Sequence, residues 1–157
     1  MLRNKGFTLV ELVAGMAIFL LLAAGLLPMC EDFFKIAETA KVNSACRLLA
    51  TDIADVQSKT LYSNLNGPAY VIMLDQYGDG YVIVKNQAVW KNVKFSELGL
   101  SPVIATCANT NQISFTENGS PKRAVSVNVY CKESSVKRKL VEVQPVTGRI
   151  VIKDATA

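Results

Sequence analysis

The chain has 157 residues, a length that suits one domain with an appendage. It contains no histidine, which removes the commonest general base and the commonest zinc ligand in proteins. The net charge is +4, and all of the excess lies in the last third, because residues 1–104 carry nine basic and nine acidic side chains, whereas residues 105–157 carry eight basic and four acidic ones. An excess of this size is too small to indicate an anionic partner by itself.

A short basic leader, residues 1–6, precedes a long apolar segment, residues 7–29. An apolar run of roughly 18 residues or more is long enough to span a bilayer. Arg3 and Lys5 precede the run, and basic residues stay on the cytoplasmic side, so we expect the C-terminal bulk of the chain outside the membrane. A secretory signal would end in a small-x-small cleavage site, and Leu22-Ala23-Ala24 is a poor one. We therefore expect the segment to be retained.

Glu11 lies inside this apolar segment. A carboxylate within a membrane helix costs roughly 2.5–3.5 kcal/mol on insertion scales, so it usually has a partner or a role. One interpretation is that Glu11 lies near enough to the helix end to reach the headgroups. The surrounding residues favour another, because Lys5-Gly6-Phe7-Thr8-Leu9-Val10-Glu11 resembles the processing site of type IV pilins and type II secretion pseudopilins.

In that family a prepilin peptidase cuts after the glycine and methylates the new N-terminus. The resemblance therefore implies cleavage between Gly6 and Phe7 and N-methylation of Phe7. The new cationic amine would lie about one helical turn from Glu11, and a buried anion becomes tolerable when a cation neutralises it. In family filaments the carboxylate meets the amine of a neighbouring subunit, so the resemblance implies that an unpaired Glu11 favours assembly.

Beyond Met29 the apolar residues recur at three- and four-residue spacing, which predicts an amphipathic helix over residues 30–62 with one buried face. The expected stripe contains Phe33, Phe34, Ala37, Ala40, Ala45, Leu48, Leu49, Ile53 and Val56, with Asp52 and other charged residues between its members. Pro28 should kink or locally unwind the helix. Pilins often carry a proline near this place, where the helix melts in filaments, and a plain kink without an assembly role is the alternative.

Residues 69–153 are predicted to be β-rich. The expected strands are Tyr70–Leu74, Tyr81–Lys85, Ala88–Phe95, Gln112–Thr116, Val125–Cys131, Lys139–Gln144 and Arg149–Lys153. Apolar and polar residues alternate along Val125–Cys131, which indicates one packed and one solvated face. The predicted fold class is α+β: a long N-terminal helix, with a transmembrane half and an amphipathic half, packed on antiparallel β-sheet. Residues 30–157 would form a pilin-like globular domain.

The C-terminal pattern narrows the resemblance. Ile113-Ser114-Phe115, then Asn118-Gly119, then a strand and a Thr147-Gly148-Arg149-Ile150 hairpin resemble the GspH/FimT group of minor pseudopilins, which contain a long helix and two β-sheets. This implies a minor subunit of a type II secretion pseudopilus or a type IV pilus-like filament. The implied partners are other pilin or pseudopilin subunits, the prepilin peptidase and the membrane. The implied location is the bacterial inner membrane, crossed once, with the C-terminal domain outside. The resemblance does not distinguish secretion, pilus and competence systems.

The four cysteines, Cys30, Cys46, Cys107 and Cys131, form no CxxC pair, so we predict no metal site. Cys107 and Cys131 belong to the exported part, where disulfides persist, and either a bridge between them or two buried free thiols fits the sequence. Cys30 and Cys46 lie about 24 Å apart on a continuous helix, which is too far for a bridge.

Lys137, Arg138 and Lys139 form a basic run, and Arg149 is a candidate addition to it. Some FimT-type pilins bind DNA through basic residues near the C-terminus, so a DNA-binding minor pilin of natural transformation is an alternative function. Those members extend the Gly-Arg turn with a further arginine, whereas Val151 stands there in this chain. That departure weighs against nucleic acid as a partner, as does the solvation that turn lysines usually have.

Three remaining features have structural interpretations. Asp75 and Asp79 suit a tight turn better than a calcium site, since calcium needs roughly six to eight oxygen ligands. Trp90 is predicted to anchor the core rather than to bind a partner. Without histidine no nucleophile-base arrangement is recognisable, so we predict no enzyme activity and no cofactor. A signal-anchored envelope protein of another function is the remaining alternative.

Overall fold

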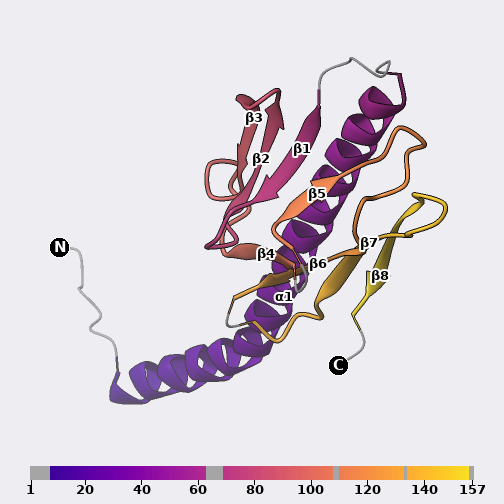
Figure 1. Cartoon of the computed structure of the whole chain (residues 1–157). Coiled ribbons are helices and arrows are strands. Elements are labelled where there is room, and N and C mark those ends of the chain that lie inside the picture. The colour runs from indigo at the N-terminus through magenta and orange to yellow at the C-terminus, as the bar shows by residue number, and fades with distance from the viewer. Residues whose placement is uncertain (1–7, 63–68, 108–109, 133, 156–157) are drawn as a thin grey trace. The chain divides into compact units, whose positions relative to one another are not determined.

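The computed structural model describes residues 8–62, 69–107, 110–132 and 134–155, apart from the side chains of residues 27–29. Within these ranges the chain forms one helix, α1 (Leu9–Tyr62), followed by eight strands (Figure 1). The strands are β1 (Tyr70–Leu74), β2 (Gly80–Lys85), β3 (Ala88–Lys94), β4 (Val103–Cys107), β5 (Gln112–Ser114), β6 (Val125–Cys131), β7 (Lys139–Val143) and β8 (Ile150–Asp154).

The chain divides into two compact units, Met1–Ala37 and Glu38–Ala157, and α1 contributes to both. Helix is assigned without a break across Pro28, so the local unwinding considered for that residue is not seen. The second unit begins within the amphipathic part of α1 and contains all the strands described above.

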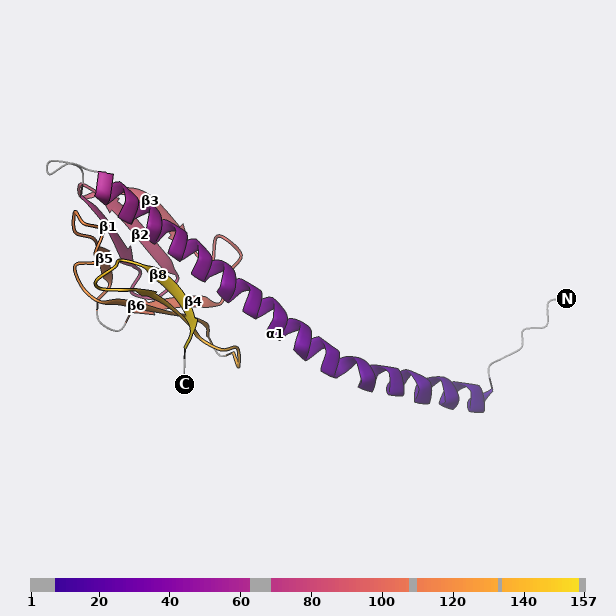
Figure 2. The same cartoon turned by 90° about the vertical axis from the view of Figure 1, so that its right-hand side faces the viewer.

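The strands of the second unit form two antiparallel sheets, ordered β3-β2-β1-β5 and β4-β6-β7-β8. The C-terminal part of α1 lies along one side of both sheets (Figure 2). This arrangement confirms the predicted α+β fold class, a long helix on antiparallel sheet. The seven expected strands are present with small shifts at their ends, whereas β4 was missed. The sequence of β4, Val-Ile-Ala-Thr-Cys, shows no alternation of apolar and polar side chains, and no tight turn joins β4 to its partner β6, so neither strand signal was present.

The core of the second unit lies between α1 and the inner faces of both sheets. Its fully buried helix side chains are Val42, Ala45, Cys46, Leu49, Ile53 and Val56. Phe33 and Phe34 are 68% and 65% exposed, so their predicted place in the buried stripe was wrong. Helical spacing identifies which side of a helix is apolar but not how far along it a sheet reaches, and residues before Glu38 belong to the other unit.

A charged side chain of α1 is also buried in this core. Asp52, expected among the solvated residues, is only 6% exposed. Its carboxylate accepts a hydrogen bond of 2.7 Å from the Tyr81 hydroxyl of β2 and bonds of 2.7 Å, one to each oxygen, from Lys91 Nζ of β3. Burial, and then the neighbouring Asp52 carboxylate, raise the pKa of Tyr81, which keeps its hydroxyl protonated as the donor. The carboxylate therefore joins the helix to two strands.

Trp90 does not anchor the core, contrary to the prediction. It lies on β3, an edge strand of its sheet, and is 44% exposed. Its ring meets Tyr70 edge to face with centroids 5.9 Å apart, and Lys59 Nζ lies 3.9 Å from the Trp90 ring centroid. Since Lys59 belongs to α1 and Tyr70 to β1, the indole packs at the periphery, where helix and sheet meet.

Two glycine turns meet α1 through one side-chain amide. Gln57 Nε2 donates to the carbonyl oxygens of Gly119, at 2.7 Å, and Gly148, at 2.9 Å. Gly148 has a φ of +65°, and a Cβ added there would lie 2.3 Å from the Gly119 oxygen and 2.4 Å from Gln57 Nε2. The Asn118-Gly119 and Thr147-Gly148 sequences therefore mark a close approach of two turns to one helix position.

Replacing Gly148 with alanine should destabilise the second unit by about 2–3 kcal/mol, because a left-handed backbone and a clash act together. Gly99→Ala is the matched control, since Gly99 has a φ of +71° but its added Cβ would meet nothing within 4 Å. That control should lose only about 1 kcal/mol. Denaturant unfolding of the full chain in detergent micelles, followed by near-UV circular dichroism, measures both values. Equal losses would show that the contact with Gln57 and Gly119 adds nothing.

Candidate functional site

The N-terminal end of α1 is closed by a reciprocal pair of hydrogen bonds. Thr8 N and Thr8 Oγ1 both donate to Glu11 Oε2 at 2.9 Å, and Glu11 N donates to Thr8 Oγ1 at 3.3 Å. This is a capping box, in which a threonine and a glutamate three residues later satisfy backbone donors of the first turn. A carboxylate there is also favoured by the helix dipole. Glu11 therefore has a partner within its own chain, which the sequence analysis missed although Thr8-Leu9-Val10-Glu11 carries the signal.

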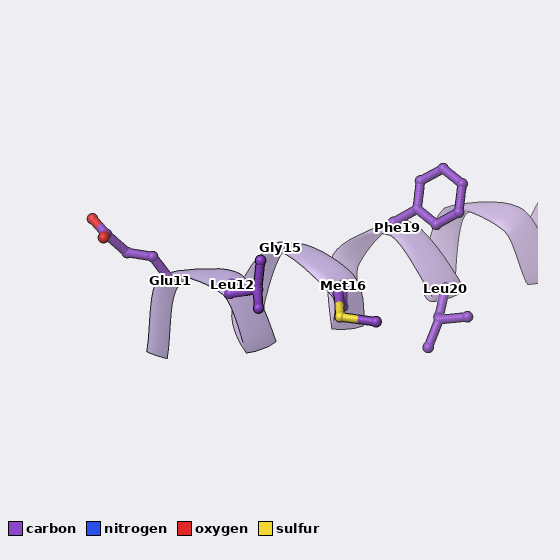
Figure 3. A pocket seen from close by; sticks show the side chains of 6 residues that line it. All are labelled: Glu11, Leu12, Gly15, Met16, Phe19 and Leu20. Carbon is purple, nitrogen blue, oxygen red and sulfur yellow. The ribbon is translucent and has the colours of Figure 1, made fainter. Parts of the chain in front are cut away.

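A shallow apolar groove begins at Glu11 and follows one face of α1. Figure 3 shows its lining residues, Leu12, Gly15, Met16, Phe19 and Leu20, with the Glu11 carboxylate directed away from the side chains of Leu12, Met16 and Leu20. A Cβ added at Gly15 would meet nothing within 4 Å, so the helix surface is open there. Small residues on such a face allow another helix to approach closely.

Apart from the half-buried Ala23, the apolar side chains of α1 from Leu9 to Leu26 are solvent-exposed. The large ones are Leu9, Val10, Leu12, Val13, Met16, Ile18, Phe19, Leu20, Leu21, Leu22 and Leu26. Within the described residues, α1 is the helix that is long and apolar enough to cross a membrane by length and composition. An exposed apolar surface of this extent marks a site of contact with lipid or with other proteins.

Gly6 and Phe7, the predicted cleavage site, lie outside the described residues. A family model described as the prokaryotic N-terminal methylation motif matches residues 1–27, which include both of them and Glu11. The chain is type IV pilin-like. The apolar helix and this motif together fit a single-pass anchor in the inner membrane of a bacterium.

The fold of this pilin-like chain is similar to that of the type IV minor pilin FimU of Pseudomonas aeruginosa. The TM-score is 0.53 at 15% sequence identity, and the match covers 71% of this chain and 91% of that one. At this identity the likeness concerns the fold alone. No curated protein matches the chain in sequence.

The hypothesis of a Cys107–Cys131 disulfide is not compatible with the strand register. In the β4–β6 pair Cys107 lies opposite Val127 and Cys131 opposite Val103, so the two cysteines are at opposite ends of the ladder. Four strand residues span about 13 Å, whereas bridged Cα atoms lie within about 7 Å. Both cysteines are free thiols.

The two buried thiols, Cys46 and Cys131, are held in the protonated form. Burial raises the pKa of Cys46 to about 11 and also raises the pKa of Cys131. The thiolate is the nucleophile in cysteine chemistry, so a raised pKa lowers the fraction of reactive thiolate at neutral pH. These two cysteines act as small apolar side chains of the core.

Three of the four candidate nucleic-acid contacts, Lys137, Arg138 and Lys139, are consecutive in the chain and lie together in the structure, whereas Arg149 does not lie with them. Lys137 and Arg138 are exposed, and Arg138 Cζ lies 4.8 Å from the Tyr130 ring centroid. Lys139 Nζ lies 3.2 Å from Asp154 Oδ1, which partly neutralises its charge. Arg149 lies at the other end of the β7–β8 hairpin, because Lys139 pairs with Asp154 whereas Ile150 pairs with Val143. The strand register therefore separates Arg149 from the basic run.

The Asp75 carboxylate accepts a hydrogen bond within its turn, and the Asp79 carboxylate accepts two from the segment after β3. Asp75 Oδ2 accepts from Tyr77 N at 3.0 Å, and the Asp79 carboxylate accepts from Ser96 N at 3.0 Å and from Ser96 Oγ at 2.5 Å. Among the described residues no group of three or more cysteine, aspartate or glutamate side chains is placed to hold a metal ion. The two aspartates shape the connection between β1 and β2.

Proposed function

We propose that the chain is the precursor of a minor pilin-like subunit. A prepilin peptidase cuts it between Gly6 and Phe7 and methylates Phe7, and residues 7–29 then anchor the subunit and assemble it into a type II secretion pseudopilus or a type IV pilus-like filament. The globular part, residues 30–157, would lie outside the inner membrane. The observation that carries the proposal is the Thr8–Glu11 capping box, which opens an exposed apolar helix directly after the predicted cleavage site and within the matched methylation motif.

The geometry of Glu11 supports a double role for its carboxylate. The two described bonds to Thr8 both end on Oε2. A carboxylate has acceptor sites on two oxygens, so capping its own helix is compatible with pairing to the Phe7 amine of a neighbouring subunit. The groove beside Glu11 offers that neighbour an apolar surface with a small residue, Gly15, at its centre. Lipid covers this surface before assembly, and neighbouring helices cover it afterwards.

Replacing Gly6 with leucine should block maturation, because the scissile bond would no longer follow a residue without a side chain. The full chain is co-expressed with a prepilin peptidase, and its intact mass is measured. We expect the wild type to lose residues 1–6 and gain one methyl group, and Gly6→Leu to remain at full length. Asn4→Ala, which also changes the leader, should mature normally. Cleavage of Gly6→Leu to the wild-type extent would contradict the proposal.

Nothing in the described residues favours the DNA-binding alternative, since Arg149 is separate from Lys137 and Arg138. The genes next to the one that encodes this chain would identify the filament system to which the subunit belongs. A secretion ATPase with a secretin would indicate type II secretion, whereas a competence nuclease with a channel would indicate DNA uptake.

A further inference from the structure

A set of cations lies at the end of the second unit where α1 enters it. We call this set the entry cluster; its members are Lys41, Lys132, Lys137 and Arg138. Ser134 Oγ donates to Glu38 Oε2, which holds the segment after β6 against the first turn of α1 in this unit. Lys132 N donates to Pro102 O at 3.1 Å, so the same segment also meets the loop before β4. Lys41 Nζ donates to Ser101 O at 2.7 Å, which places it beside the same loops.

The entry cluster has more positive than negative charge. The ion pair between Lys139 and Asp154 is neutral in sum. Glu38 is hydrogen-bonded to Ser134, and the sequence adds Glu133, whose placement is outside the described residues. Four cations against these two carboxylates leave an excess of two positive charges.

The length of the connection keeps this end of the unit near the bilayer. If residues 7–29 span the membrane, as proposed above, only residues 30–37 separate the span from Glu38. Eight residues rise about 12 Å as a helix and reach at most about 29 Å when fully extended, whatever the orientation of the two units. Such a tether gives the cluster a high effective concentration at the headgroup surface.

We infer that the entry cluster binds anionic phospholipid headgroups and holds the globular unit against the membrane before the subunit is assembled. The inference rests on the membrane anchoring of the proposed function. Each lysine or arginine close to an anionic bilayer strengthens binding by about fivefold, and salt weakens the effect. A bilayer is favoured over DNA because the other exposed basic pair, Lys122 and Arg123, precedes β6, whereas Lys132 follows it. The seven described residues of β6, Val125–Cys131, include no lysine or arginine that would join the two ends of the strand.

The test compares lysine reactivity in one molecule in two lipid environments. The full chain is reconstituted into vesicles of zwitterionic phospholipid alone or with about 30% anionic phospholipid, at about 20 mM salt, where screening is weak. Acetylation by acetic anhydride, a neutral reagent, is measured by mass spectrometry at Lys132 and Lys137, with Lys122 as the internal reference. We expect anionic lipid to reduce acetylation of Lys132 and Lys137 at least threefold relative to Lys122, and about 1 M salt to abolish the difference. Equal changes at all three lysines would overturn the inference.

Two double variants with the same loss of charge form the matched pair. In Lys137→Ala/Arg138→Ala the remaining Lys132 should lose its protection by anionic lipid, whereas Lys122→Ala/Arg123→Ala should keep it. Retained protection in the first variant would overturn the inference. The wild-type comparison between lipids stands even if a variant folds poorly.

Two further outcomes distinguish binding to anionic lipid from binding to DNA and from failure of the proposed function. If duplex DNA added to the chain in neutral detergent protects Lys137 while anionic vesicles do not, the ligand is nucleic acid and the inference fails. Extraction of the chain from membranes by alkaline carbonate would contradict the proposed function itself. A chain that resists extraction but shows no protection of Lys137 overturns only the inference about lipid.

Discussion

Replacing Glu11 with glutamine should leave maturation intact and reduce filament assembly at least tenfold. Glutamine retains the capping box with Thr8, because its side-chain oxygen accepts the same hydrogen bonds, but it carries no charge. The methylated amine of a neighbouring subunit would then be left uncompensated among apolar helices, at a cost of several kcal/mol. Since about 1.4 kcal/mol corresponds to a tenfold change in an equilibrium constant, the loss of assembly should be large. The measurement is the amount of filament sheared from cells, relative to mature subunit in the membrane.

Two controls separate the charge of Glu11 from its role as a cap. Glu11→Ala removes both and should add a loss of about 1 kcal/mol in stability of the first turn, visible as fraying rather than as a further loss of filament. Glu31→Gln makes the same chemical change at an exposed carboxylate of α1 beyond the apolar segment and should assemble normally. Normal filaments from Glu11→Gln would show that capping, not ion pairing, explains the carboxylate.

Replacing Asp52 with alanine should destabilise the second unit by about 2–3 kcal/mol. The change leaves the buried Tyr81 hydroxyl and Lys91 Nζ without their shared acceptor. The loss lies below the usual range for a fully buried pair, because the Lys91 side chain is 40% exposed and can turn to solvent. Thermal unfolding of the full chain in detergent should show a midpoint lower by roughly 10 °C.

The matched control for Asp52 is Asp55→Ala, one turn later on α1. Asp55 also pairs with a lysine, at 2.5 Å from Lys59 Nζ, but its side chain is 42% exposed, so we expect a loss of less than about 1 kcal/mol. Similar losses from both variants would show that burial of Asp52 adds nothing. Replacing Asp52, Tyr81 and Lys91 together with leucine, phenylalanine and methionine should recover much of the stability, because no polar group is then left unpaired.

Alkaline pH gives an independent check of the Asp52 contact. The pKa of Tyr81 is raised in the folded chain, so its contribution is complete below the unfolded value of about 10 and is lost as the pH rises above it. Unfolding free energies measured on both sides of pH 10 should therefore fall more steeply for the wild type than for Tyr81→Phe. Parallel pH profiles would contradict the burial of a protonated hydroxyl.

Local pattern predicted the elements of the fold but not the environment of several side chains. The alternation in Val125–Cys131 specified a strand and its buried face, because successive side chains of a strand point to opposite faces of the sheet. Asp52 has the same helical spacing as a solvated residue, and only the positions of Tyr81 and Lys91, far away in sequence, make its burial favourable. Trp90 has an apolar sequence context but lies on an edge strand. Strand order, on which its exposure depends, is not encoded locally.

For the candidate sites, the sequence predicted the features that are local in the chain but not those that depend on how strands pair. The cleavage motif and Glu11 are adjacent in sequence, so their register could be read directly, and the matched methylation motif covers them. The sequence left open both the Cys107–Cys131 bridge and the grouping of Arg149 with the basic run, because each depended on which ends of two strands lie side by side. That information comes from the register of β4 with β6 and of β7 with β8.

The path of β8 determines where the chain can be labelled. β8 runs antiparallel to β7, and Ala155 N donates to Arg138 O at 2.9 Å, so the described chain ends beside the loop that Ser134 fixes to Glu38. A fluorescent protein fused after Ala157 would therefore lie at the end of the globular unit where α1 enters it. There it would obstruct the entry cluster. The exposed β2–β3 turn at Asn86-Gln87 lies toward Lys59, since Tyr70 pairs with Lys85 and contacts Trp90. A short epitope in that turn would report on the subunit without occupying the end from which it is anchored.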